Sequence, residues 1–250
     1  SSEPTINRTG ESSVVVFGRN PKALGDFCNV NGGDTNRASG EYDVVAGGDS
    51  NFADSEFSTI SGGESNEIAF SSTECTISGG KTNIIPVNSN ARTSVITGGQ
   101  GNTVCFGTDK NCSGCTVSGG GSITCNAKEA VRTGGSFGFV LGDRSVATGG
   151  EDNEVFGKNA VIVGGENNIA VGTLSIALGT QAQAIKDSSM VINLNPDGKK
   201  SLKSKKAGQF IANAKSYTFQ IGKNNDDDGL SIQITEDNIQ NLIDALENAV

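Results

Sequence analysis

Short apolar triplets recur along most of this chain, and a pair of glycines follows nearly every one. The triplets are rich in Val, Ile and Thr, as at residues 44–46, 59–61 and 161–163. Such β-branched runs, bounded by glycine, are typical of short β-strands. The glycine pairs begin at Gly32, Gly47, Gly62, Gly79, Gly98, Gly119, Gly134, Gly149 and Gly164, and Gly179 continues the series.

The spacing of these glycines is 15 residues at most steps and rises to 17, 19 and 21 residues in the middle of the chain. A fixed period of this size predicts a solenoid, in which each coil is one small structural unit stacked on the next. The longer steps predict surface insertions, and the region 64–118 that contains them is where we expect a partner to bind.

Two further positions recur in each coil, and both predict a buried role. Four residues after the first glycine stands an amide, which stacked coils can join into a ladder. The amide column is Asn36, Asn51, Asn66, Asn83, Asn102, Asn153, Asn168 and Gln183, interrupted by Ile123 and Gly138. Two residues later comes the expected interior column, Ala38, Ala53, Ile68, Ile85, Val104, Cys125, Val140, Val155, Ala170 and Ile185.

These patterns predict an all-β fold, a parallel β-solenoid (β-roll) with coils of about 15 residues. We expect an N-terminal extension at residues 1–12, the solenoid at 13–186 and a C-terminal cap at 187–250. Because the end of a solenoid exposes unpaired strand edges, the cap should contain strands. Its last part, about 236–250, has the apolar spacing of a helix.

Two late triplets, 161–163 and 176–178, are apolar at all three positions. Successive side chains of a strand point to opposite faces, so these strands are expected to be covered on both sides. Val161, Val163, Ile176 and Leu178 are therefore candidates for a wall that contacts another copy of the chain. The alternative is that a loop or the cap of the same chain covers them.

Composition removes several classes of function. The chain has no His, so a catalytic triad that depends on His cannot form, and zinc hydrolase sites lose their usual ligand. The net charge of −9 argues against binding to nucleic acid or to anionic membranes. No run of 18 apolar residues exists, so no insertion into a membrane is expected. We expect a protein that is not an enzyme and that needs no cofactor or metal.

The six cysteines, an even number, favour disulfides and an oxidising compartment. The disulfide candidates are Cys28, Cys75, Cys105, Cys112, Cys115 and Cys125. Free buried thiols and a metal site at Cys112-Ser-Gly-Cys115 remain as alternatives. Asn7 and Asn111 each begin a glycosylation triplet, which also fits secretion.

The pattern Gly-Gly-x-x-Asn-x-Ala-Ser-Gly-x-x-x-Val-Val-x-Gly-Gly at residues 32–48 resembles the head repeats of trimeric autotransporter adhesins of the YadA type. Residues 170–179 are similar to the same repeats, and the resemblance extends over about 13–186. It implies a left-handed parallel β-roll, three chains around one axis and a role in surface attachment.

Together, the residues and the resemblance lead to one functional expectation. The chain is expected to be a homotrimeric structural or adhesive fibre subunit outside the cell or on a cell or virion surface. Its loops would present sites for a surface glycan or a protein, and end-to-end association into filaments stays open. The alternative is a solenoid that binds ice, or that binds or processes glycans.

Overall fold

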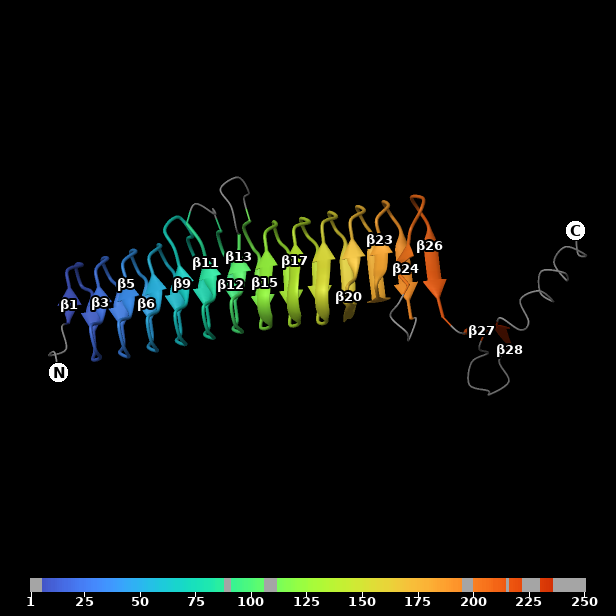
Figure 1. Cartoon of the computed structure of the whole chain (residues 1–250). Helices are drawn as coiled ribbons and strands as arrows, with labels where there is room; N and C mark the ends of the chain where they lie inside the picture. Colours follow the sequence, from blue (N-terminus) through green and yellow to red (C-terminus); the bar gives the residue numbers. More distant parts are fainter. Residues whose placement is uncertain are drawn as a thin grey trace, which may run out of the picture.

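The protein is a long rod made by one chain that winds through about 12 turns (Figure 1). The computed structural model describes residues 6–87, 91–105, 112–194, 200–214, 216–221 and 230–235. Each coil contains about 15 residues, and all pairings between coils are parallel. The predicted parallel β-solenoid is therefore confirmed as the fold.

Two walls of strands run along the rod, because each strand pairs with the strand two places further along the chain. The odd wall contains β1 (Asn7–Arg8), β3 (Lys22–Ala23), β5 (Arg37–Ala38), β7 (Phe52–Ala53), β9 (Glu67–Ile68), β11 (Ile84–Ile85), β13 (Thr103–Val104), β15 (Gly121–Cys125), β17 (Ser136–Val140), β19 (Glu151–Val155), β21 (Ile169–Ala170), β23 (Ala182–Ala184) and β25 (Leu202–Lys203). The even wall contains β2 (Val14–Val15), β4 (Asn29–Val30), β6 (Val44–Val45), β8 (Thr59–Ile60), β10 (Thr76–Ile77), β12 (Val95–Ile96), β14 (Thr116–Ser118), β16 (Val131–Thr133), β18 (Val146–Thr148), β20 (Val161–Glu166), β22 (Ile176–Thr180), β24 (Met190–Asn193) and β26 (Phe210–Asn213).

The core is a thin column between the two walls. The odd wall supplies small residues at its start, such as Ala38 and Ala53, and larger ones such as Ile68 further along. The even wall faces them with residues such as Val45 and Ile60. All five are fully buried, and in β6 and β8 a half-buried residue precedes the buried one. The predicted interior column is thus confirmed as far as Ala170.

The predicted amide ladder exists and joins successive coils. The Asn51 Oδ1 accepts the backbone N–H of Asn66 at 3.1 Å, and its Nδ2 donates to the Gly47 carbonyl at 3.0 Å and the Gly63 carbonyl at 2.9 Å. Every ladder Asn is fully buried. Buried amides are costly unless they are satisfied, so these bonds explain why Asn recurs at this position.

The second glycine of each pair is required by close packing between coils. At Gly48, φ is +91°, and a Cβ atom would lie 2.3 Å from the carbonyl oxygen of Gly63. No side chain can be accommodated there without moving the backbone of the next coil. The first glycine of the same pair, Gly47, has open space around its Cα.

The stack extends beyond the predicted boundaries at both ends. β1 pairs with β3, so the coil stack includes residues assigned to an N-terminal extension. β24 and β26, expected to belong to a cap, continue the even wall. The strand at 217–221 does not pair with 210–214, because β27 (Ser216–Ile221) forms an antiparallel hairpin with β28 (Leu230–Thr235). The helix expected at about 236–250 lies outside the described residues.

The register of the last predicted repeat is shifted by one residue. Asn168 Oδ1 accepts the N–H of Ala182, not of Gln183, and Ala184 rather than Ile185 occupies the interior column. The cause is a shorter coil. Gly179 is followed by Thr180 instead of a second glycine, and the pairing of β20 with β22 shifts register there.

Arg132 replaces the amide where the ladder is interrupted. This fully buried side chain donates from Nε to the Gly134 carbonyl at 3.3 Å and from Nη2 to the Phe137 carbonyl at 3.3 Å. An Asn in place of Gly138 would bond to that same Gly134 carbonyl, since ladder amides bond to the glycine four residues before them. The guanidinium occupies the space next to Gly138, where a Cβ atom would lie 3.4 Å from Nη2.

Candidate functional site

The outward face of the even wall forms a continuous surface along the described part of the rod. It has two columns of side chains that run the length of the rod, and no residue of either column carries a charge. The first column is Val14, Asn29, Val44, Thr59, Thr76, Val95, Thr116, Val131, Val146, Val161, Ile176, Met190 and Phe210. The second is Val16, Asn31, Ala46, Ser61, Ser78, Thr97, Ser118, Thr133, Thr148, Val163, Leu178, Ile192 and Ala212.

The odd wall differs in charge. Its outward positions include Lys22, Arg37, Glu67, Glu154 and Lys203. Arg37 forms an ion pair with Asp54 and lies over the ring of Phe52 at 4.7 Å. A charged wall of this kind is an ordinary hydrated surface. The absence of charge is therefore specific to the even wall and is not a property of the whole repeat.

The four residues predicted to contact another copy lie together on the uncharged face. Val161 pairs with Ile176 and Val163 with Leu178, in register on neighbouring strands. Val163 is 49% exposed, and the other three are half-buried. No element in the described part of the chain covers Val163, so the alternative of a covering loop has no support there.

One corner of the rod carries a ladder of aromatic rings. Phe27, Tyr42 and Phe57 occupy the same position in three successive coils, and adjacent ring centroids lie 4.9 Å apart in stacked geometry. All three have left-handed backbone, with φ between 56° and 60°. The residues just before two of them, Glu41 and Glu56, add exposed carboxylates beside the rings.

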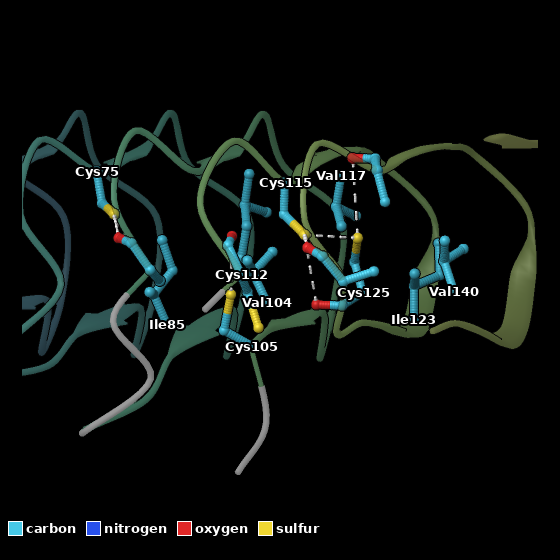
Figure 2. Packing of buried hydrophobic residues seen from close by; sticks show 14 of the residues in the cluster. Cys75, Ile85, Val104, Cys105, Cys112, Cys115, Val117, Ile123, Cys125 and Val140 are labelled. Carbon is cyan, nitrogen blue, oxygen red and sulfur yellow. Dashed lines mark hydrogen bonds between the residues drawn. The ribbon is translucent and has the colours of Figure 1, made fainter. Parts of the chain in front are cut away.

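All six cysteines are buried, and Figure 2 shows how Cys75, Cys105, Cys112, Cys115 and Cys125 lie in the core. The Sγ atoms of Cys115 and Cys125 are 3.1 Å apart. Cys105 donates to the carbonyl of Cys112 at 3.3 Å. Cys28 and Cys75 stand beside strands three coils apart, about 14 Å at the usual strand spacing, which no disulfide within one chain can span.

The thiols of Cys105, Cys112, Cys115 and Cys125 form a cluster, and the pKa values of Cys115 and Cys125 in it are shifted in opposite directions. Hydrogen bonds with Cys105 and Cys125 lower the pKa of Cys115 below its usual range, against the raising effect of burial. Hydrogen bonding to Cys115, together with burial, raises the pKa of Cys125 well above its usual range. Cys115 is therefore the first of these thiols to lose its proton. The disulfide prediction stays a prediction, and the geometry restricts it to the four cysteines between 105 and 125.

The glycosylation candidates are placed only in part. Asn7 is an exposed residue of β1, so its side chain is accessible to modifying enzymes. Asn111 lies outside the described residues. Within the described ranges, no group of three or more Cys, Asp or Glu side chains has an arrangement that could hold a metal ion. Those ranges also contain no helix with the length and apolar character needed to span a membrane.

Sequence reasoning missed two of the chemically unusual residues. Arg132 stands in a strand triplet, where a charged side chain is ordinarily directed outward, yet it points into the core. The signal available in the sequence was the coincidence of this arginine with the loss of Asn at Ile123 and Gly138. Asp43 was missed because it looks like any acid in a turn, although it is fully buried.

The fold and its uncharged wall define the class: the chain is a parallel β-solenoid repeat protein with coils of about 15 residues. A scan against protein-family models and a search of curated proteins found nothing that matches this chain. The similarity to YadA-type heads stays a resemblance in the repeat.

Proposed function

We propose that this chain is a non-enzymatic, extracellular fibre subunit whose even wall is covered by other copies of the same chain. The observation that carries the proposal is the uncharged face that runs along the whole rod. A contiguous exposed apolar surface ordinarily marks an interaction site, and this face is apolar from Val161 to Phe210. A second copy is the simplest partner, because an identical rod has the same coil spacing and can match the face along its full length.

Three chains around one axis is the arrangement that we propose, since the resemblance to YadA-type heads supports it. The wall becomes more apolar towards its C-terminal part, from Val161 through Ile176 to Met190 and Phe210. We therefore expect this part to contribute most to association, because apolar area removed from water is the main favourable term.

The test is the mass of the full chain in solution, measured by light scattering at micromolar concentration. Three times the chain mass of 25.5 kDa is expected. The change Val163→Lys should dissociate the assembly, because it places an unpaired ammonium group in the contact. Val171→Lys is the matched control, since Val171 is 44% exposed and lies off the even wall.

Two outcomes would remove the proposal. One is a monomer for the unaltered chain at these concentrations. The other is an equal effect of Val163→Lys and Val171→Lys on the measured mass, which would mean that the even wall has no special role. Circular dichroism of both variants shows whether each remains folded, so that loss of the fold is not mistaken for dissociation.

Ice binding is a second candidate, favoured by one stretch of the same face. In each coil from β8 to β18, at least one residue of the outward pair carries a hydroxyl group, and no outward residue is charged. No pair has Thr at both positions, however, so the hydroxyl array is irregular. A gap between freezing and melting temperature would support ice binding, and equal temperatures are expected if the wall serves assembly.

A further inference from the structure

A groove with a volume of about 470 Å³ lies at the corner that leads from the odd wall to the even wall. Its floor is formed by two coils of ordinary length, at residues 39–41 and 54–56. The next coil is two residues longer, and its turn, which includes Phe70, Ser71 and Thr73, borders the groove as a step. Arg92, one coil further, completes the lining.

The polar lining contains hydrogen-bond donors and acceptors, and it includes both negative and positive side chains. Glu41 and Glu56 are exposed, and neither forms an ion pair with any residue that the structure describes. Asp54 differs, because Arg37 neutralises it. Ser71 and Thr73 carry hydroxyl groups, and Arg92 adds an exposed guanidinium.

The apolar part of the lining is the ring of Phe70, which is 70% exposed. A large aromatic side chain on a protruding turn gains nothing from burial in its own fold at that exposure. Beside the groove, the ladder that contains Tyr42 and Phe57 adds a second apolar strip. The groove therefore combines an aromatic surface with carboxylates, hydroxyls and one cation.

We propose that this groove binds a neutral saccharide. Sugar hydroxyl groups both donate and accept hydrogen bonds, so they can donate to Glu41 and Glu56 and accept from Arg92. The C–H face of a pyranose ring can pack on Phe70. An acidic ligand would meet the two glutamates, and a basic peptide would meet Arg92. The volume lies in the usual range for small-ligand sites.

The experiment measures binding of soluble neutral oligosaccharides to the full chain. A glycan array covering neutral hexose and N-acetylhexosamine polymers identifies the probe, and saturation-transfer NMR gives its dissociation constant. Phe70→Ala should weaken binding at least tenfold, and Glu56→Gln severalfold. Phe139→Ala is the matched control, because Phe139 is an exposed ring (45%) on β17, far from the groove along the rod.

Failure of this proposal is distinguishable from failure of the assembly proposal, because a soluble oligosaccharide needs only one groove. No binding across the array would overturn it, as would binding that Phe70→Ala leaves unchanged. Preferential binding of trilysine or of a sulfated oligosaccharide would also overturn it, in favour of a charged ligand. Phe70→Ala, Glu56→Gln and Phe139→Ala all alter exposed side chains, so their melting temperatures should match that of the unaltered chain.

Discussion

At the scale of single residues, Asp43 is expected to make the free energy of unfolding depend on pH. Its carboxylate is fully buried and accepts the backbone N–H groups of Gly40 at 2.8 Å and Ser58 at 2.9 Å. Burial raises the pKa of Asp43 to about 7, against the lowering effect of these bonds. The adjacent coils have Cys28 and Ser58 at the same position, and Ser13 occupies it one coil earlier, so the acid is not required by the repeat.

The sign of the effect follows from the raised pKa. Between about pH 4 and pH 7, the folded state holds a proton that the unfolded state releases, so the free energy of unfolding falls as pH rises. The total loss by pH 8 is on the order of 4 kcal/mol. Asp43→Ser should remove this slope, and it should raise the melting temperature at pH 8.

Thermal unfolding between pH 4 and pH 8, followed by circular dichroism, measures the slope directly. Asp49→Ser is the control, because Asp49 is exposed and its replacement should leave the pH dependence as in the unaltered chain. If Asp43→Ser has the same slope as the unaltered chain, Asp43 is not the group that titrates.

At the scale of elements, Arg132 and Gly138 are expected to be coupled. Arg132→Ile leaves buried carbonyls without donors, which should cost about 1–3 kcal/mol. Gly138→Asn alone should also destabilise, because its φ of 134° disfavours a Cβ, which would lie 2.4 Å from the Asn153 carbonyl oxygen, and because the guanidinium occupies the space that the new amide needs. In the double variant the backbone must still shift at residue 138, but the guanidinium no longer blocks the amide, which can then bond to the Gly134 carbonyl as ladder residues bond to their own glycines.

We therefore predict that the double variant is more stable than the sum of the two single changes implies, by at least about 1 kcal/mol. The melting temperatures of the unaltered chain, the two single variants and the double variant together form a double-mutant cycle, which gives the coupling energy. Additive effects would contradict the view that the arginine substitutes for the ladder amide.

The thiol cluster leads to a prediction about oxidation. Because Cys115 and Cys125 are fully buried, oxidised glutathione can reach them only when the coil opens locally. In that opened state the Cys115 thiolate attacks the glutathione disulfide and releases one glutathione. Cys125 then attacks the mixed disulfide, so that a Cys115–Cys125 bridge forms and a second glutathione leaves. The bridge should stabilise the coil by about 2–3 kcal/mol.

Mass spectrometry of protease fragments detects the bridge as a linked peptide pair that has lost two hydrogens. Cys115→Ser should abolish it, whereas Cys75→Ser should leave it unchanged. Linkage of Cys125 to any other cysteine would contradict the assignment.

At the scale of the whole molecule, the sequence predicted the period, the amide ladder and the interior column, because each coil repeats them at fixed spacing. The prediction from the sequence was wrong at the places where the spacing of the repeat changed. The missing glycine after Gly179 moved the register by one residue. The long step from Met190 to Phe210 hid the fact that β24, β25 and β26 continue the stack. The inward direction of Arg132 was missed because strand position alone predicts an outward charge, and only its coincidence with the loss of Asn at Ile123 and Gly138 indicated otherwise.

The candidate surfaces were predictable to different degrees. The uncharged wall was visible in part, because Val161, Val163, Ile176 and Leu178 stand out as apolar. The groove was not visible as a site, since its lining comes from four coils. The expectation that the long coils at 64–118 bind a partner stays a prediction. The proposed groove takes Phe70 from that region, whereas Glu41 and Glu56 lie before it.

The amide ladder has one further consequence. Each ladder Asn bonds to the coil after it in the same way, as the parallel contacts of Asn51 and Asn66 show. One whole coil can therefore be copied or deleted in the gene while every joint stays chemically identical. The length of the rod would then change by about 4.8 Å for each coil gained or lost. Insertion or deletion of coils could therefore change the length of the protein without a change in its fold.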